Sequence, residues 1–96
     1  MKQVYTVTAI CCLLLSSPVF SGQAEYDDCI LKYLKNAKLD SATHLIKQAC
    51  EDNYKNPNFT SNKKRKFNNC LLENLPGIES QQAVIDINAA CGNKYK

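Results

Sequence analysis

The spacing of four cysteines constrains the fold of this chain more strongly than any other feature. Cys29, Cys50, Cys70 and Cys91 are separated by 21, 20 and 21 residues. A structural zinc site usually takes two of its ligands from a close pair such as C-x-x-C, and these four cysteines contain no such pair. An even set of cysteines in a short exported chain is typical of disulfides. We therefore expect disulfides, and we expect no metal or other cofactor.

The cysteine spacing is part of an internal repeat with an offset of 41 residues. Residues 26–55 read YDDCILKYLKNAKLDSATHLIKQACEDNYK, and residues 67–96 read FNNCLLENLPGIESQQAVIDINAACGNKYK. Aligned without gaps, the two copies share nine identical residues: Cys29/Cys70, Leu31/Leu72, Leu34/Leu75, Ala42/Ala83, Ile46/Ile87, Ala49/Ala90, Cys50/Cys91, Tyr54/Tyr95 and Lys55/Lys96. Because the cysteines and the apolar positions recur together, we interpret the copies as two versions of one structural unit.

Residues 1–24 are interpreted as a secretory signal peptide. Lys2 is their only charged residue, and residues 4–15 form an apolar run that is shorter than the roughly 20 residues needed to span a membrane. We expect cleavage after Ala24, with cleavage after Ser21 as the alternative. The predicted mature chain has no transmembrane segment and is expected in the periplasm or outside the cell.

The apolar residues of each copy recur at intervals of three and four, which is typical of amphipathic helices. Alternation of the kind found in strands is absent from the sequence. The sequence therefore predicts an all-α protein built from two tandem antiparallel helical hairpins. Residues 25–55 form the first hairpin, residues 56–66 a basic linker and residues 67–96 the second hairpin.

Each predicted hairpin has a recognisable turn. A break near residues 38–40 divides the first copy, and Asp40 or Ser41 is expected to cap the helix that follows. In the second copy, residues 75–77 read Leu-Pro-Gly and are expected to end a helix, after which Ser80 caps the next one.

The cysteines of each copy lie at equal distances from the predicted turn. Cys29 and Cys50 are equidistant from residues 39–40, and Cys70 and Cys91 are equidistant from residues 80–81. Residues at such positions face each other in an antiparallel hairpin. We therefore predict the disulfides Cys29–Cys50 and Cys70–Cys91. Four cysteines permit three pairings, and the sequence alone leaves the other two open.

The second copy carries a recognisable motif between Cys70 and Tyr95. It consists of a cysteine, two aliphatic residues, an E-N-L step, a glycine with an aliphatic residue, a serine and a final A-C-x-x-K-Y. This motif resembles that of small secreted "four-cysteine" proteins of Gram-negative bacteria. The first copy fits less closely, with Asn36-Ala37 where Gly77-Ile78 stands. The resemblance implies bacterial origin, export and fold, but it implies no catalytic residue and no mechanism.

The linker carries all the positive excess of the predicted mature chain. Residues 56–66 read NPNFTSNKKRK, which is typical of a loop, whereas each hairpin has a net charge of −1. The simpler interpretation of Lys63, Lys64, Arg65 and Lys66 is a solvated cluster that keeps the protein soluble. The functional interpretation is a contact with an anion on a protein or an envelope component. The formal net charge of +3 is small, so nucleic acid is not the expected partner.

The sequence offers little catalytic machinery. His44 is the only histidine, and Ile85 stands at its place in the second copy. No glycine-rich phosphate loop, HExxH or GxSxG motif occurs. An enzyme is therefore the least supported class.

The expected function is that of a small non-enzymatic binding or inhibitor module, whose partner is a protein or an anionic envelope component. The alternative is a membrane-perturbing or antimicrobial effector that uses the basic linker and an exposed apolar face such as Leu72, Val84 and Ile85. Val84 and Ile85 replace Thr43 and His44, so the second hairpin has a wider apolar stripe. We expect the two hairpins, or two chains of a homodimer, to pack there.

Overall fold

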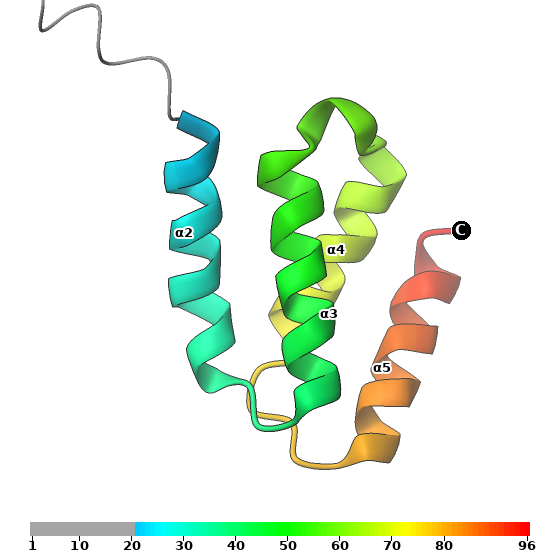
Figure 1. The fold of residues 1–96 in the computed structure, drawn as a ribbon. Helices are drawn as coiled ribbons and strands as arrows, with labels where there is room; N and C mark the ends of the chain where they lie inside the picture. Colours follow the sequence, from blue (N-terminus) through cyan, green and yellow to red (C-terminus); the bar gives the residue numbers. More distant parts are fainter. Residues whose placement is uncertain (1–20) are drawn as a thin grey trace, which may run out of the picture.

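The computed structural model describes residues 21–96, and these residues form four α-helices and no strand (Figure 1). The predicted all-α fold is confirmed. The signal-peptide prediction lies mainly on residues 1–20, outside the described part, and residues 21–24 begin the first helix. The elements are α2 (Ser21–Tyr33), the 3-10 turn η2 (Leu34–Asn36), α3 (Asp40–Cys50), the π-helical turn η3 (Glu51–Lys55), the 3-10 turn η4 (Pro57–Phe59), α4 (Asn62–Asn74) and α5 (Gln81–Lys94).

Each disulfide joins the two helices of one hairpin, as predicted. Helices α2 and α3 run antiparallel, and so do α4 and α5 (Figure 1). The Cα atoms of Cys29 and Cys50 are 5.8 Å apart, and those of Cys70 and Cys91 are also 5.8 Å apart. The bridges therefore fasten two separate hairpins, and they settle the choice between the three pairings.

The two turns are built differently. Ser80 caps α5 as predicted, because its side chain accepts a hydrogen bond from the Ala83 backbone N–H at 3.3 Å. The predicted capping of α3 by Asp40 or Ser41 is wrong. The N-cap is Leu39, which makes no side-chain cap, and the Ser41 hydroxyl donates instead to Gln81 of the other hairpin at 2.8 Å.

The second turn depends on a glycine. Helix α4 ends at Asn74, before the segment Leu75-Pro76-Gly77, as predicted. Gly77 has a φ of 84°, a conformation that side chains with a Cβ rarely adopt. Its backbone N–H donates to the Asn36 carbonyl at 2.8 Å, so the turn of one hairpin is bonded to the turn of the other.

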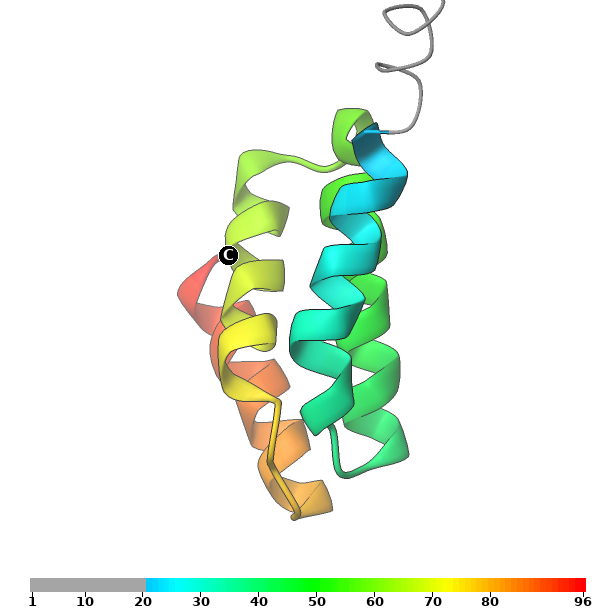
Figure 2. The ribbon, with the colours of Figure 1, turned by 90° about the vertical axis from the view of Figure 1, so that its left-hand side faces the viewer.

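Helix α3 is the centre of the packing. It contacts α2 within its own hairpin and both α4 and α5 of the second hairpin, and Figure 2 shows the two hairpins as two adjacent layers. The fully buried apolar side chains come from all four helices and their turns and make one core: Cys29, Ala42, Ile46, Ala49, Cys50, Leu71, Leu72, Leu75, Val84 and Cys91. Burial of each large aliphatic side chain contributes about 1.5–3 kcal/mol.

The segment predicted as a linker is more ordered than expected. Helix α4 begins at Asn62, because the Ser61 side chain accepts a hydrogen bond from the Lys64 backbone N–H at 3.1 Å. Before it, the Thr60 hydroxyl lies 2.7 Å from the Asp52 carbonyl and 2.9 Å from the Asn56 carbonyl. The basic residues 63–66 therefore belong to the start of a helix rather than to a flexible linker.

Candidate functional site

Equivalent residues of the two repeat copies differ sharply in exposure. Leu31 is 67% exposed, whereas Leu72, the same residue in the second copy, is only 3% exposed. Thr43 is half-buried and its counterpart Val84 is buried. The same face of the hairpin is therefore covered in the second copy and open in the first.

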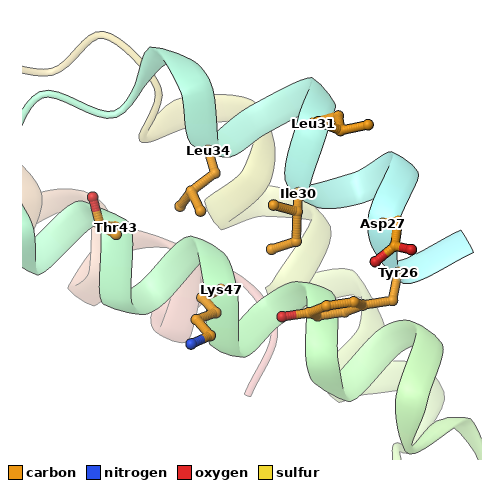
Figure 3. Close-up of a pocket in the computed structure, with 7 residues that line it drawn as sticks. All are labelled: Tyr26, Asp27, Ile30, Leu31, Leu34, Thr43 and Lys47. Carbon is orange, nitrogen blue, oxygen red and sulfur yellow. The ribbon is translucent and has the colours of Figure 1, made fainter. Parts of the chain in front are cut away.

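The open face of the first hairpin forms a groove between α2 and α3 of about 590 Å³. In Figure 3, Ile30 of α2 and Leu34 of η2 point towards α3, the Tyr26 ring reaches α3, and Leu31 points outward. The Lys55 ammonium group of η3 lies 4.2 Å from the centre of the Tyr26 ring, a distance at which the cation attracts the ring face. The lining is mostly apolar with one acid and one base: Tyr26, Asp27, Ile30, Leu31, Leu34, Thr43 and Lys47.

The corresponding groove of the second hairpin, between α4 and α5, is filled by α3. The residues of the second copy that are equivalent to the lining of the open groove are Phe67, Asn68, Leu71, Leu72, Leu75, Val84 and Asn88. Five of these seven residues are buried, namely Asn68, Leu71, Leu72, Leu75 and Val84. The protein therefore shows how a groove of this shape accommodates a helix.

The face of α3 that fills this groove is a stripe of small and aliphatic residues. Ala42, Ile46, Ala49 and Asn53 are all buried, and their spacing of four, three and four residues places them on one face of the helix and its π-helical extension. Two alanines in this stripe allow the α3 backbone to approach α4 closely. We name these four residues the α3 stripe.

A network of hydrogen-bonded asparagines lies at one end of the contact between the α3 stripe and α4. The Asn68 side-chain amide donates to Asn53 Oδ1 at 3.0 Å, and the Asn53 amide donates to Asn69 Oδ1 at 3.0 Å. Arg65 adds a hydrogen bond from its guanidinium group to the Asn53 carbonyl at 3.1 Å. This network could not be predicted from the sequence, because nothing in a local pattern of asparagines indicates that they meet in the folded chain.

The four basic residues predicted as an anion contact do not act alike. Lys63, Lys64 and Lys66 are exposed. Arg65 is half-buried and also donates to the Pro57 carbonyl at 3.4 Å, so it holds η4 and η3 against α4. The three lysines are accessible to a partner, although the Lys64 ammonium group also lies 4.6 Å from the centre of the Phe67 ring.

The residues predicted as an apolar interface are separated by the fold. Leu72 and Val84 are buried in the core, whereas Ile85 is 52% exposed. An exposed face made of all three residues therefore does not exist. Leu72 and Val84 lie where the two hairpins pack, because the groove that contains them receives α3.

Comparison with known proteins identifies the family. A family model described as four-cysteine protein VF_A0006-like matches residues 6–95. The chain belongs to this family. No curated protein and no solved structure matches the chain. The resemblance of the repeat to four-cysteine proteins is thus confirmed, and in this member of the VF_A0006-like family the four cysteines form the two bridges described above.

Features of the described residues of this four-cysteine protein relate to its cellular compartment, to membrane crossing and to metal binding. The two disulfides are consistent with an oxidising compartment outside the cytoplasm. Among the helices of residues 21–96, none combines the length and apolar character that a membrane crossing requires. Within the same residues, no three or more histidine, cysteine or acidic side chains gather in a group that could hold a metal ion.

Proposed function

We propose that this four-cysteine protein is a binding module of the periplasm or the extracellular space, and that it acts by taking an amphipathic helix of a partner protein into the α2–α3 groove. The observation that carries the proposal is the contrast between Leu31, which is 67% exposed, and Leu72, which is 3% exposed. A surface that the second copy covers with a helix is left open in the first copy.

The filled groove indicates the chemistry of the partner. The α3 stripe presents two alanines and an isoleucine to the apolar lining, and it ends on a polar side chain that is hydrogen-bonded. A helix with small residues at the close contacts and one larger aliphatic residue between them has the shape that such a groove accepts. The open groove adds Asp27 and Lys47, so charges at matching positions on the partner helix would fix its direction.

The test is a titration of the mature chain with a helix-stabilised peptide of residues 39–55 that carries Cys50→Ala. We expect saturable NMR shifts at Leu31 and Thr43. Leu31→Lys should weaken binding at least tenfold, because it removes an apolar contact and buries a charge. Ile85→Lys is the matched control, since Ile85 is an exposed aliphatic residue outside the groove lining, and its binding should equal that of the parent. NMR shifts that do not saturate would contradict the proposal. So would binding to the Leu31→Lys variant that is as strong as binding to the parent.

A second candidate function, contact with an anionic membrane surface, is favoured by an exposed aromatic residue beside the lysines. Phe59 is 92% exposed and precedes α4 by only a few residues. Lys63 and Lys64 lie in the first turn of α4, where positive charge opposes the helix dipole. The Lys64 ammonium group lies 4.6 Å from the centre of the Phe67 ring, and this contact accounts for that lysine. The helix dipole does not account for Lys63. An apolar tip flanked by cations is suited to the interface of an anionic membrane.

Vesicle sedimentation tests this second candidate. Vesicles with anionic phosphatidylglycerol should bind the mature chain, and vesicles of neutral phosphatidylcholine should not. Replacing Lys63, Lys64 and Lys66 by glutamine should lower binding by more than tenfold, because each lysine near an anionic surface contributes about 1 kcal/mol. Dye leakage in the same samples distinguishes perturbation of the membrane from adsorption. Equal binding to both kinds of vesicle would exclude an electrostatic contact.

A further inference from the structure

We infer that the open α2–α3 groove binds a second copy of this chain. The second copy inserts the outer face of its α5 into the groove. This inference rests on the proposed function, in which the α2–α3 groove takes a helix. It names the partner and predicts a head-to-tail association of identical chains.

The two hairpins of one chain already pack in a head-to-tail manner. Gly77 donates to Asn36, its equivalent in the first copy, at 2.8 Å, and Ser41 donates to Gln81, one residue short of its own equivalent, at 2.8 Å. Turn therefore meets turn, and the groove face of one hairpin meets the stripe face of the other. Because this contact joins the groove of one hairpin to the stripe of the other, it uses only one groove and one stripe. The groove of the first hairpin and the stripe of the second hairpin remain open.

The second hairpin carries the counterpart of the α3 stripe on α5. An offset of 41 residues carries the α3 stripe onto Ala83, Ile87, Ala90 and Lys94 of α5, which we name the α5 stripe. Ala49 is 1% exposed, whereas its counterpart Ala90 is exposed. Ala83 and Ile87 are half-buried, and part of the Ile87 side chain packs against the core. Within residues 21–96, no helix covers the α5 stripe as α4 covers the α3 stripe, although it keeps the same two alanines and the same isoleucine.

The charges of the α5 stripe and of the open groove are complementary. Inside the chain, Asn53 of the α3 stripe bonds to Asn68 and Asn69. At the equivalent positions of the proposed contact, Lys94 takes the place of Asn53, and Asp27 and Asp28 take the places of the two asparagines that it contacts. A neutral amide network is thus replaced by a lysine opposite two carboxylates.

The positions of Asp27, Asp28 and Lys94 allow them to determine which helix binds in the groove and in which register it binds. Asp27 already lines the groove, Asp28 is exposed near it, and Lys94 is exposed at the end of α5. Asp40 and Gln82 stand at the places of Gln81 and Ser41, so the side-chain hydrogen bond between the hairpins also has a counterpart, with an amide as donor and a carboxylate as acceptor. Opposite charges across a contact select the partner and fix its register.

A charge swap tests the inference on the mature, oxidised chain. Sedimentation velocity should show oligomers that become larger as the concentration rises, because each head-to-tail contact leaves a free groove at one end and a free stripe at the other until a ring closes. Lys94→Glu alone should weaken association at least tenfold, and so should Asp27→Lys combined with Asp28→Lys, because each places like charges together. A mixture of these two variants should associate again, since every contact between unlike chains then pairs opposite charges. Ile85→Lys, outside the α5 stripe, should associate like the parent.

The outcomes separate this inference from the proposed function. A chain that stays monomeric up to about 1 mM, while its groove still binds the peptide of residues 39–55, overturns self-association and leaves helix binding in place. A groove that binds neither peptide nor chain contradicts both. Association that persists in both charge variants, or that the mixture does not restore, places the contact elsewhere and overturns the inference.

Discussion

Replacing Cys29 and Cys50 together by alanine is expected to lower the free energy of unfolding by about 3 kcal/mol or more. The bridge closes a loop between residues 21 apart in the sequence, and removal of such a constraint increases the entropy of the unfolded chain by that order. Both cysteines are buried, and Cys50 belongs to the central helix, so lost packing adds to the effect. Urea unfolding followed by far-ultraviolet circular dichroism measures the change.

The second bridge provides the matched control for this experiment. Cys70 and Cys91 close a loop of the same length, so the entropic effect is equal, but Cys70 is only half-buried and α5 is a peripheral helix. Replacing this pair by alanine is therefore expected to cost less than replacing the first pair. A loss below about 1 kcal/mol for the first pair, or a larger loss for the second, would contradict the central position of α3.

Ile46→Ala is expected to destabilise the protein by about 3 kcal/mol. Ile46 has no exposed surface, and it lies on α3, which contacts α2, α4 and α5. Truncation therefore leaves a cavity that neighbouring groups cannot fill. In a domain of this size, 1 kcal/mol corresponds to a change in melting temperature of about 4–8 °C. A scanning calorimeter should therefore record a decrease of more than about 10 °C.

The internal repeat supplies the comparison for this substitution. Ile87 is the equivalent of Ile46, but it is half-buried on α5. Ile87→Ala removes the same atoms from a less enclosed site, and we expect less than half of the effect. Equal decreases in melting temperature for the two variants would mean that α5 is covered as α3 is. That result would refute the claim that the α5 stripe is uncovered.

The helices and the disulfide pairing could be predicted because local signals specify them. Apolar residues at intervals of three and four residues fix the helices, and cysteines at equal distances from a turn can reach each other. Ser80 caps α5 for the same local reason, since a serine before a helix can accept a backbone hydrogen bond. The α3 cap failed because Asp40 and Ser41 already belong to the helix, and the Ser41 hydroxyl bonds to the other hairpin.

The choice of which groove is filled could not be predicted from local patterns. Leu31 and Leu72 are identical residues in aligned positions, yet one is exposed and the other is buried. Docking of one hairpin on the other decides their exposure, and that contact is distant in sequence. The only sequence signal was the wider apolar stripe at Val84, a residue that the structure places in the core beside α3.

Disulfide mapping of the oxidised protein, without the predicted signal peptide, tests most directly the central claim that each hairpin is closed by its own bridge. Trypsin cleaves after lysine and arginine, and no such residue lies between Cys70 and Cys91. We predict an intact peptide of residues 67–94 that is lighter by two hydrogen atoms than its reduced form. We also predict that the peptide ending at Lys32 is joined to that of residues 48–55. A peptide of residues 67–94 joined to either of the others would contradict the two-hairpin account.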